Sequence, residues 1–279
     1  MGVADVIPGV SGGTIAFITG IYDRFIYGLS KIGSFAKDLL KIFTKNGFSK
    51  VKQSFKKKVD YPFFIPLLLG TTFAFILGSK FIPPLIKQYP AFVFSFFVGL
   101  ILASAYIVYK DIEEHKLSGW IMGLLGLIIG FIIAILPVAG DGAKPSILFV
   151  TLIGAISIIA MVMPGISGSY IVLMFGQYTF LLSIIRDLAN LWHYFAAFTI
   201  GGIIGILFFS RLLSYLLKHF HAWTMFALTG IMLGAVYRPA KDAVFNMYGT
   251  GDVVISGVLL MVGAFFVIFL DSFKKKKIK

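Results

Sequence analysis

Cysteine is absent from this chain of 279 residues. Its absence excludes disulfides, thiolate metal sites and cysteine nucleophiles. Histidine is scarce, and the four histidines form neither an HExxH pattern nor another metal-ligand spacing. Two of them, His219 and His221, stand beside Lys218 in a polar stretch, where a solvated face is expected. We therefore predict no metal site and no cofactor.

Charged residues are also few, at 13% of the chain, against about a quarter in soluble domains. Hydrophobic residues make up 58%. Several apolar runs reach about 20 residues, which is enough to cross the hydrocarbon core of a bilayer as a helix. Lipid-facing backbone must satisfy its own hydrogen bonds, and continuous apolar runs favour helices over the alternating strands of a barrel. The sequence predicts an all-α, polytopic membrane protein.

The Lys and Arg residues are distributed unevenly among the joints between the apolar segments. If residues 31–58 and the tail 274–279 lie in the cytoplasm, eighteen of these residues lie inside and six outside. This bias predicts a multi-pass protein of the bacterial cytoplasmic (inner) membrane with a cytoplasmic C-terminus. The expected apolar segments are 3–30, 61–82, 91–109, 118–137, 146–163, 164–185, 192–217, 223–238 and 253–271.

The net charge of +13 is concentrated in these flanking joints, so anionic membrane lipids explain it better than nucleic acid does. Residues 31–58 carry nine lysines. We interpret this insertion as a basic amphipathic segment on the anionic cytoplasmic leaflet. A disordered basic loop is the alternative that the sequence leaves open.

A motif with the pattern PGxSG occurs twice. Residues 8–15 read PGVSGGTI and residues 164–171 read PGISGSYI, 156 positions later, and GIY at 20–22 matches GQY at 176–178. Downstream the similarity resumes at an offset of 131, and the difference of 25 residues is close to the length of the basic insertion. The pairs at that offset are Gly70 and Gly201, Gly99 and Gly230, Tyr106 and Tyr237, Lys110-Asp111 and Lys241-Asp242, and Gly126 and Gly257.

The repeat predicts two halves, 1–137 with the insertion 31–58, and 138–279. Three spans between the two motifs place the motifs on opposite sides of the membrane, so the halves are inverted-topology repeats. Each half is expected to be one re-entrant hairpin carrying the motif, followed by three transmembrane helices. The first motif has too few residues around it for two full spans, whereas 146–163 is long enough to span completely, and the sequence leaves that second case open.

The motif supplies a break followed by a helix start. Proline donates no backbone hydrogen bond, glycine permits the turn, and serine is a favoured N-cap. The free amides and positive dipole end of such a helix attract anions, and small residues let a phosphate approach the backbone. The alternative is close helix packing through small residues. The candidate anion-binding residues are Ser11, Gly12, Gly13, Thr14, Ser167, Gly168 and Ser169.

Charged residues near the apolar segments are candidates for ion coupling. Asp5 stands three residues before Pro8 and is expected at membrane depth, where an ionisable group is a functional candidate. Asp23, Asp187 and His193 are further candidates as proton carriers, with nothing in the sequence to rank them. Arg24, Arg186, Arg211 and Arg238 flank the apolar segments. For Arg24, interfacial anchoring and headgroup binding stay open as alternatives, and Arg186 is placed similarly on the outer side, while interfacial anchoring is the simplest interpretation of Arg211 and Arg238.

The stretch DVIPGVSGGT at 5–14, followed by GIYDR at 20–24, resembles the signature of the bacterial polyprenyl-phosphate translocases, formerly a membrane family of unknown function. The resemblance extends over essentially the whole chain. It implies a carrier that returns undecaprenyl phosphate from the outer to the inner leaflet, which recycles the lipid carrier of envelope synthesis. The substrate partner would then be a polyprenyl-phosphate lipid.

We therefore expect a flippase in which the two motifs form the phosphate cradle and Arg24 and Arg186 attract the headgroup at opposite faces. The lipid tail can stay in the bilayer while the phosphate follows a polar path. The alternative is a small inorganic anion channel or exchanger that uses the same paired helix N-termini. An intramembrane enzyme is disfavoured, since no Ser/His/Asp or metal constellation falls at membrane depth. The oligomeric state, including a homo-oligomer, stays open.

Overall fold

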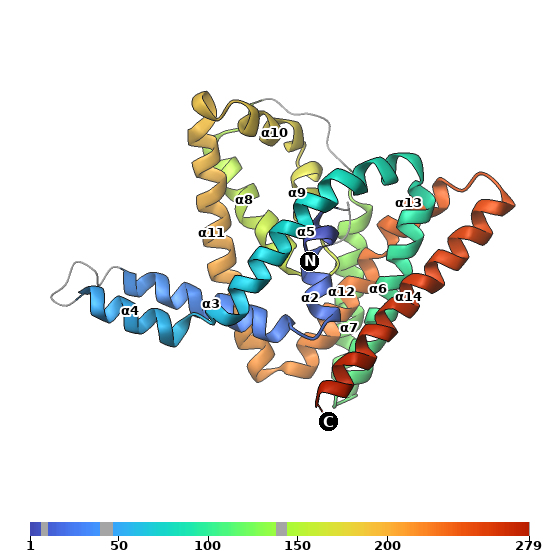
Figure 1. The fold of residues 1–279 in the computed structure, drawn as a ribbon, viewed down its shortest axis with the longest axis horizontal. Helices are drawn as coiled ribbons and strands as arrows, with labels where there is room; N and C mark the ends of the chain where they lie inside the picture. Colours follow the sequence, from blue (N-terminus) through green and yellow to red (C-terminus); the bar gives the residue numbers. More distant parts are fainter. Residues whose placement is uncertain (7–10, 40–46, 138–143, 279) are drawn as a thin grey trace.

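The computed structural model describes residues 1–6, 11–39, 47–137 and 144–278, and it contains only helices among them (Figure 1). This confirms the predicted all-α class. The helices are α1 (Gly2–Asp5), α2 (Gly12–Ile18), α3 (Tyr22–Leu39), α4 (Gly47–Lys58), α5 (Tyr61–Gln88), α6 (Pro90–Asp111), α7 (Leu117–Ile135), α8 (Ile147–Val162), α9 (Gly168–Met174), α10 (Tyr178–Arg186), α11 (Leu188–His219), α12 (His221–Ala235), α13 (Tyr237–Phe245) and α14 (Thr250–Ile278).

Five described helices are long and apolar enough to cross a membrane: α5, α6, α7, α11 and α14. A sixth span is possible by length and composition if α9 and α10, which meet at a bend of 110°, count as one. The apolar α8 has 16 residues, short for a complete span. Helix α6 is the most buried of the five, whereas α5 and α14 present most of their surface outward. The apolar exterior is what lipid contact requires.

Glycines set the closest helix contacts, and several of these contacts lie in two matching pairs of helices. A Cβ on Gly99 of α6 would lie 1.9 Å from the carbonyl oxygen of Leu260 in α14, and one on Gly230 of α12 would lie 2.0 Å from that of Gly123 in α7. Contacts this close need glycine, since it lets two backbones touch. Gly99 and Gly230 are 131 positions apart, while Leu260 and Gly123 are 137 apart.

The same register appears at a second pair of contacts. A Cβ on Gly263 would lie 2.1 Å from the carbonyl of Phe96, and one on Gly126 would lie 2.2 Å from that of Ala227. Packing therefore relates Gly126 to Gly263, although the sequence comparison paired it with Gly257. A Cβ on Gly257 would meet nothing within 4 Å, so that glycine makes no equivalent contact.

The α6–α7 joint and the α11–α12 joint lie at the same end of the molecule. They share a polar groove whose walls include Glu113, Lys116, Lys218 and His221. Helix α6 ends there and α12 begins there, so these neighbouring helices run in opposite directions. If the predicted segments alternate from a cytoplasmic 31–58 insertion, both joints fall on the cytoplasmic side, and this arrangement agrees with that part of the predicted topology.

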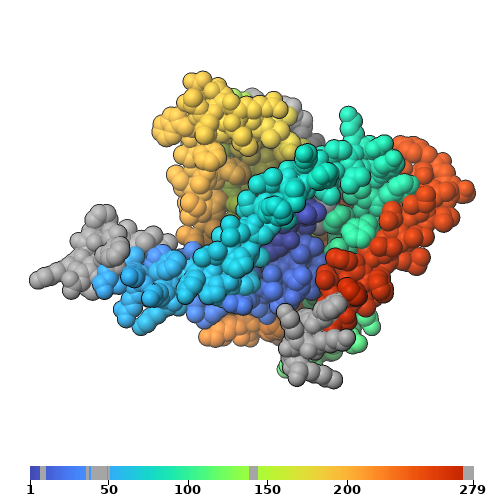
Figure 2. Space-filling view, in the orientation of Figure 1, coloured from blue at the N-terminus to red at the C-terminus, as the bar shows by residue number. Residues whose placement is uncertain are grey.

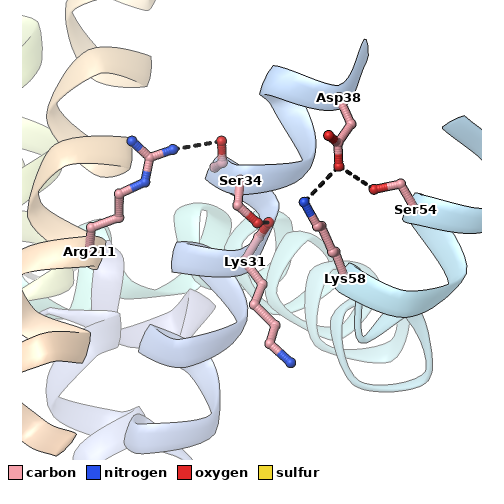
Figure 3. Close-up of polar contacts among 7 residues, drawn as sticks. Lys31, Ser34, Asp38, Ser54, Lys58 and Arg211 are labelled. Carbon is pink, nitrogen blue, oxygen red and sulfur yellow. Dashed lines mark hydrogen bonds and ion pairs between the residues drawn. The ribbon is translucent and has the colours of Figure 1, made fainter. Parts of the chain in front are cut away.

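The described parts of the basic insertion form a helical hairpin of α3 and α4, which projects from the body of the molecule (Figure 1). The carboxylate of Asp38 accepts hydrogen bonds from Lys58 Nζ, at 2.6 Å, and from Ser54 Oγ (Figure 3). Arg211 of α11 donates to the Gly33 carbonyl at 2.7 Å and ties α3 to the body. The helical interpretation thus holds for 31–39 and 47–58, while contact with the leaflet stays a prediction.

Candidate functional site

The two PGxSG motifs meet inside the molecule. Ser11 Oγ donates a hydrogen bond to the Met163 carbonyl at 3.0 Å, and the Gly165 amide donates to Thr14 Oγ1 at 2.9 Å. The partners of each bond are more than 150 positions apart in the sequence. Residues 8–10 of the first motif lie outside the described residues. The sequence predicted that helix starts would face each other here, and the described parts of the two motifs are in direct contact.

The first motif is closed by protein partners. Ser11 is 1% exposed, has extended backbone and caps α2, because its Oγ accepts from the Thr14 amide at 3.2 Å. The Gly12 amide donates to the Asp5 carboxylate at 2.6 Å. A Cβ on Gly13 would lie 2.4 Å from the Val162 carbonyl, so this glycine serves close packing. In this conformation the Asp5 carboxylate faces the start of α2.

The second motif has the same backbone break but different side-chain bonds. Gly165 has φ +88°, the left-handed region that glycine tolerates. Ser167 stands at the N-cap of α9, yet its Oγ pairs with Ser169 Oγ at 2.8 Å and makes no capping bond. A Cβ on Gly168 would lie 2.5 Å from the Ser157 carbonyl of α8. Gly168 therefore packs against α8 on one side.

A cavity of about 440 Å³, which we call the motif cavity, opens beside the second motif. It lies between α5, α8, α9, α10 and α11, and Figure 2 shows a recess between α5 and the end of the molecule formed by α10 and α11. Most of its wall is apolar. The lining residues are Phe75, Ser157, Ile158, Met161, Gly168, Ser169, Val172, Tyr178, Leu181, Leu182, Ile184, Ile185, Phe195 and Phe198.

Arg238 of α13 reaches the opposite side of α9. Its Nη1 lies 3.4 Å from the Tyr170 hydroxyl, its guanidinium carbon lies 5.2 Å from the Tyr170 ring centre, and its Nε lies 3.4 Å from Asp242 Oδ2. Together with Gly165 and Ser167 it lines a narrow gap. The sequence analysis interpreted Arg238 as an interfacial anchor. No sequence pattern predicted that Arg238 would lie beside the second motif, because the direction of its side chain depends on the break between α12 and α13.

The two arginines predicted to attract a headgroup lie away from the motif contact. Arg24 of α3 forms a bidentate ion pair with Asp60, with N–O distances of 2.7 and 3.1 Å, and stacks on Phe63. This pairing holds the pKa of Asp60 below its ordinary value. Arg186 ends α10 and is exposed. A role for either in headgroup capture stays a prediction.

Of the acidic candidates for ion coupling, Asp5 touches a motif, through the Gly12 amide. The Asp23 carboxylate lies 3.3 Å from His221 Nε2, and both side chains are exposed. The Asp187 carboxylate accepts hydrogen bonds from Asn190 Nδ2 at 2.9 and 3.1 Å. The His193 ring packs 4.5 Å from that of Tyr194. Within the described ranges, no three His, Asp or Glu side chains are grouped so as to hold a metal ion.

Comparison with known proteins identifies the family. Residues 1–248 match the VCA0040-like family, described as undecaprenyl phosphate translocase-like. A polyprenyl-phosphate transporter of Vibrio cholerae is 38% identical over 236 residues, which cover 85% of this chain and 73% of the relative. A polyprenyl-phosphate transporter of Staphylococcus aureus is 28% identical over 282 residues, covering 94% of this chain and 90% of the relative. No solved structure matches.

The names of the family and of both relatives are those of transporters, which agrees with the prediction that the chain is no enzyme. The family match covers most of the chain, including both motifs and α5 to α13. The chain therefore belongs to the undecaprenyl phosphate translocase-like family of membrane proteins.

Proposed function

We propose that this protein is a flippase that moves undecaprenyl phosphate from the outer to the inner leaflet of the bacterial cytoplasmic membrane, where the lipid re-enters envelope synthesis. Membership of the family and the names of the two relatives support a polyprenyl phosphate as the substrate. The direction of transport and the recycling role come from the sequence resemblance.

One structural observation carries the proposal. Gly168 and Ser169 of the second motif form a polar corner of a cavity whose other walls are apolar. A prenyl phosphate is divided in the same way into a polar and an apolar part, because it has a charged headgroup and a hydrocarbon chain. A free inorganic anion would leave the apolar walls without a partner, so the cavity favours the lipid phosphate over the small-anion alternative.

The halves 1–137 and 138–279 are proposed to exchange roles during alternating access. The matching glycine contacts of α6 with α14 and of α12 with α7 support an inverted repeat. Gly20 and Gly176, 156 positions apart, also share the left-handed backbone, with φ of 70° and 64°. In the conformation described, the second motif borders a cavity and the first is closed. The opposite conformation would open the first motif and close the second.

In that exchange the Asp5 carboxylate stands in for the phosphate. It accepts the hydrogen bond of the Gly12 amide at the start of α2, where the sequence predicts a bound anion. A phosphate that reaches this amide must displace the carboxylate, or meet it after protonation, because two anions repel at such a distance. Asp5 is therefore the proposed point of ion coupling, ahead of Asp23 and Asp187, which lie on other contacts.

The membrane orientation completes the proposal. With the C-terminus in the cytoplasm, the α3–α4 hairpin lies at the inner leaflet, and its exposed Lys52, Lys56 and Lys57 face anionic lipids. Arg24 then attracts the headgroup on the inner side and Arg186 on the outer side. Helix α10, which forms a wall of the motif cavity, lies in the outer half of the bilayer, where the substrate enters.

Reconstitution tests this function directly. Purified protein is placed in liposomes that carry labelled undecaprenyl phosphate in the outer leaflet, and accessibility of the phosphate to a membrane-impermeant reagent is followed with time. Protection that requires the protein, with no matching flux of chloride or inorganic phosphate, is the expected result. Anion flux without lipid movement would instead establish the channel or exchanger alternative.

A further inference from the structure

Ser157 of α8 has a buried hydroxyl without a hydrogen-bond partner. The residue is 4% exposed, and its Oγ makes no bond with any part of the chain that the structure describes. Serine in an apolar helix usually bonds back to a carbonyl of the preceding turn, as Ser104 Oγ does to Leu100. A buried polar atom that lacks a partner calls for an explanation, and a ligand or water that completes it is one.

The unpaired hydroxyl belongs to a residue that lines the motif cavity, next to the second motif. A Cβ added at Gly168 would collide with the carbonyl oxygen of Ser157, so α8 and the start of α9 are in contact at this point. Ser169 contributes a second hydroxyl to the same wall and already pairs with Ser167. Two serines, Ser157 and Ser169, thus lie beside Gly168 on one part of a mostly apolar wall.

The remainder of the wall suits a branched hydrocarbon chain. It consists of aliphatic and aromatic side chains from four helices, and Phe75 of α5 closes it from the first half of the chain. A volume of about 440 Å³ lies within the usual range for small-molecule sites. A headgroup and the first units of a prenyl chain fit that range, while the rest of a long tail stays in the bilayer.

We propose that the motif cavity is the binding site for the phosphate end of a polyprenyl phosphate, and that Ser157 is one of its ligands. The Ser157 hydroxyl, which is buried in this conformation, turns toward the cavity and donates to a phosphate oxygen beside Ser169. The first prenyl units lie against Leu182 and Phe195. This assignment rests on the proposed function and adds to it a residue outside the two motifs.

Binding is tested with the full chain in nanodiscs and a farnesyl phosphate that carries a photoreactive diazirine on its prenyl chain. Labelled peptides are expected from α8 to α11, around Ile158, Leu182 and Phe195. Loss of one hydrogen bond to a charged group corresponds to about tenfold weaker binding in Ser157→Ala. Ser210→Ala is the matched control, because Ser210 is also buried and unpartnered but lies outside the cavity.

The structure also offers a competing cavity, of about 460 Å³, between α6, α7 and α12, with Tyr109, Trp120 and Phe226 in its wall. Labelling confined to that cavity would overturn the assignment. Equal binding by Ser157→Ala and Ser210→Ala would overturn the role of Ser157 as a ligand.

A cavity-filling variant separates this assignment from the proposed function. Leu182→Trp is expected to lower both labelling and lipid transport at least tenfold, while Leu148→Trp, on the exposed start of α8, changes neither. Normal labelling and transport in Leu182→Trp would refute the site and leave the function intact. Labelling of the cavity in a protein that moves no lipid would uphold the site and refute the flippase.

Discussion

Replacing Ser11 by alanine removes three hydrogen bonds of its Oγ, of which the one with Thr14 Oγ1, at 3.1 Å, is local. The same change at its repeat partner Ser167 removes one bond of a different kind. Ser11 Oγ caps α2 through the Thr14 amide and bonds the Met163 carbonyl across the two motifs. Loss of an N-cap costs about 1 kcal/mol, and an interhelical hydrogen bond in a membrane protein averages about 0.6 kcal/mol. The expected loss for Ser11→Ala is therefore about 1.6 kcal/mol of unfolding free energy.

Ser167→Ala should cost less, because the Ser167 hydroxyl makes no capping bond and pairs with Ser169 alone. One side-chain bond of this kind is worth about 0.6 kcal/mol. The assay is thermal or denaturant unfolding of each variant in one detergent, followed by tryptophan fluorescence. Equal losses in the two variants, or a larger loss for Ser167→Ala, would show that the caps are not as described and would refute the distinction between a closed first motif and an open second one.

Three further perturbations test other parts of the molecule. Gly99→Ala should sharply destabilise the folded protein, since its Cβ would lie 1.9 Å from a carbonyl, whereas Gly257→Ala, with open space around it, should be neutral or gain up to about 1 kcal/mol in unfolding assays. Arg238→Gln should alter the concentration dependence of lipid transport severalfold, because Arg238 contacts Tyr170 of α9; unchanged transport in liposomes would contradict this. The lowered pKa of Asp60 predicts a stabilising contribution that is present above its unfolded value of 3.8 and is lost as pH falls further. Asp60→Asn should remove that acid dependence, which unfolding measured from about pH 5 down to about pH 2 would show.

The structure changes how a substitution at Gly168 is interpreted. A side chain there was expected to block the approach of a phosphate to the backbone. Its Cβ would first meet the Ser157 carbonyl at 2.5 Å, so Gly168→Val perturbs the packing of α8 against α9 whatever the substrate does. Loss of transport in Gly168→Val is therefore weak evidence that the motifs bind the phosphate. Full activity of that variant would still contradict phosphate binding by the motifs. Ser157→Ala and Leu182→Trp probe the same cavity without a backbone clash.

The sequence alone determined the helical class, the repeated helix starts and the basic insertion. These features are local: proline and glycine break the backbone, serine favours a helix start, and apolar length decides what can face lipid. Helices α2 and α9 accordingly begin at Gly12 and Gly168, directly after the two motif serines. Nothing beyond neighbouring residues is needed for such predictions.

Tertiary packing alone decided what each motif residue touches. Ser11 and Ser167 occupy the same place in the pattern, yet one caps a helix and the other pairs with a neighbouring serine. The surroundings differ, because Ser11 bonds the Met163 carbonyl and the adjacent Gly12 amide bonds the Asp5 carboxylate. The orphan hydroxyl of Ser157, the cavity beside it and the approach of Arg238 to Tyr170 likewise join elements far apart in the chain. Local preference carries no information about such contacts, since they depend on which helices pack together and in what register.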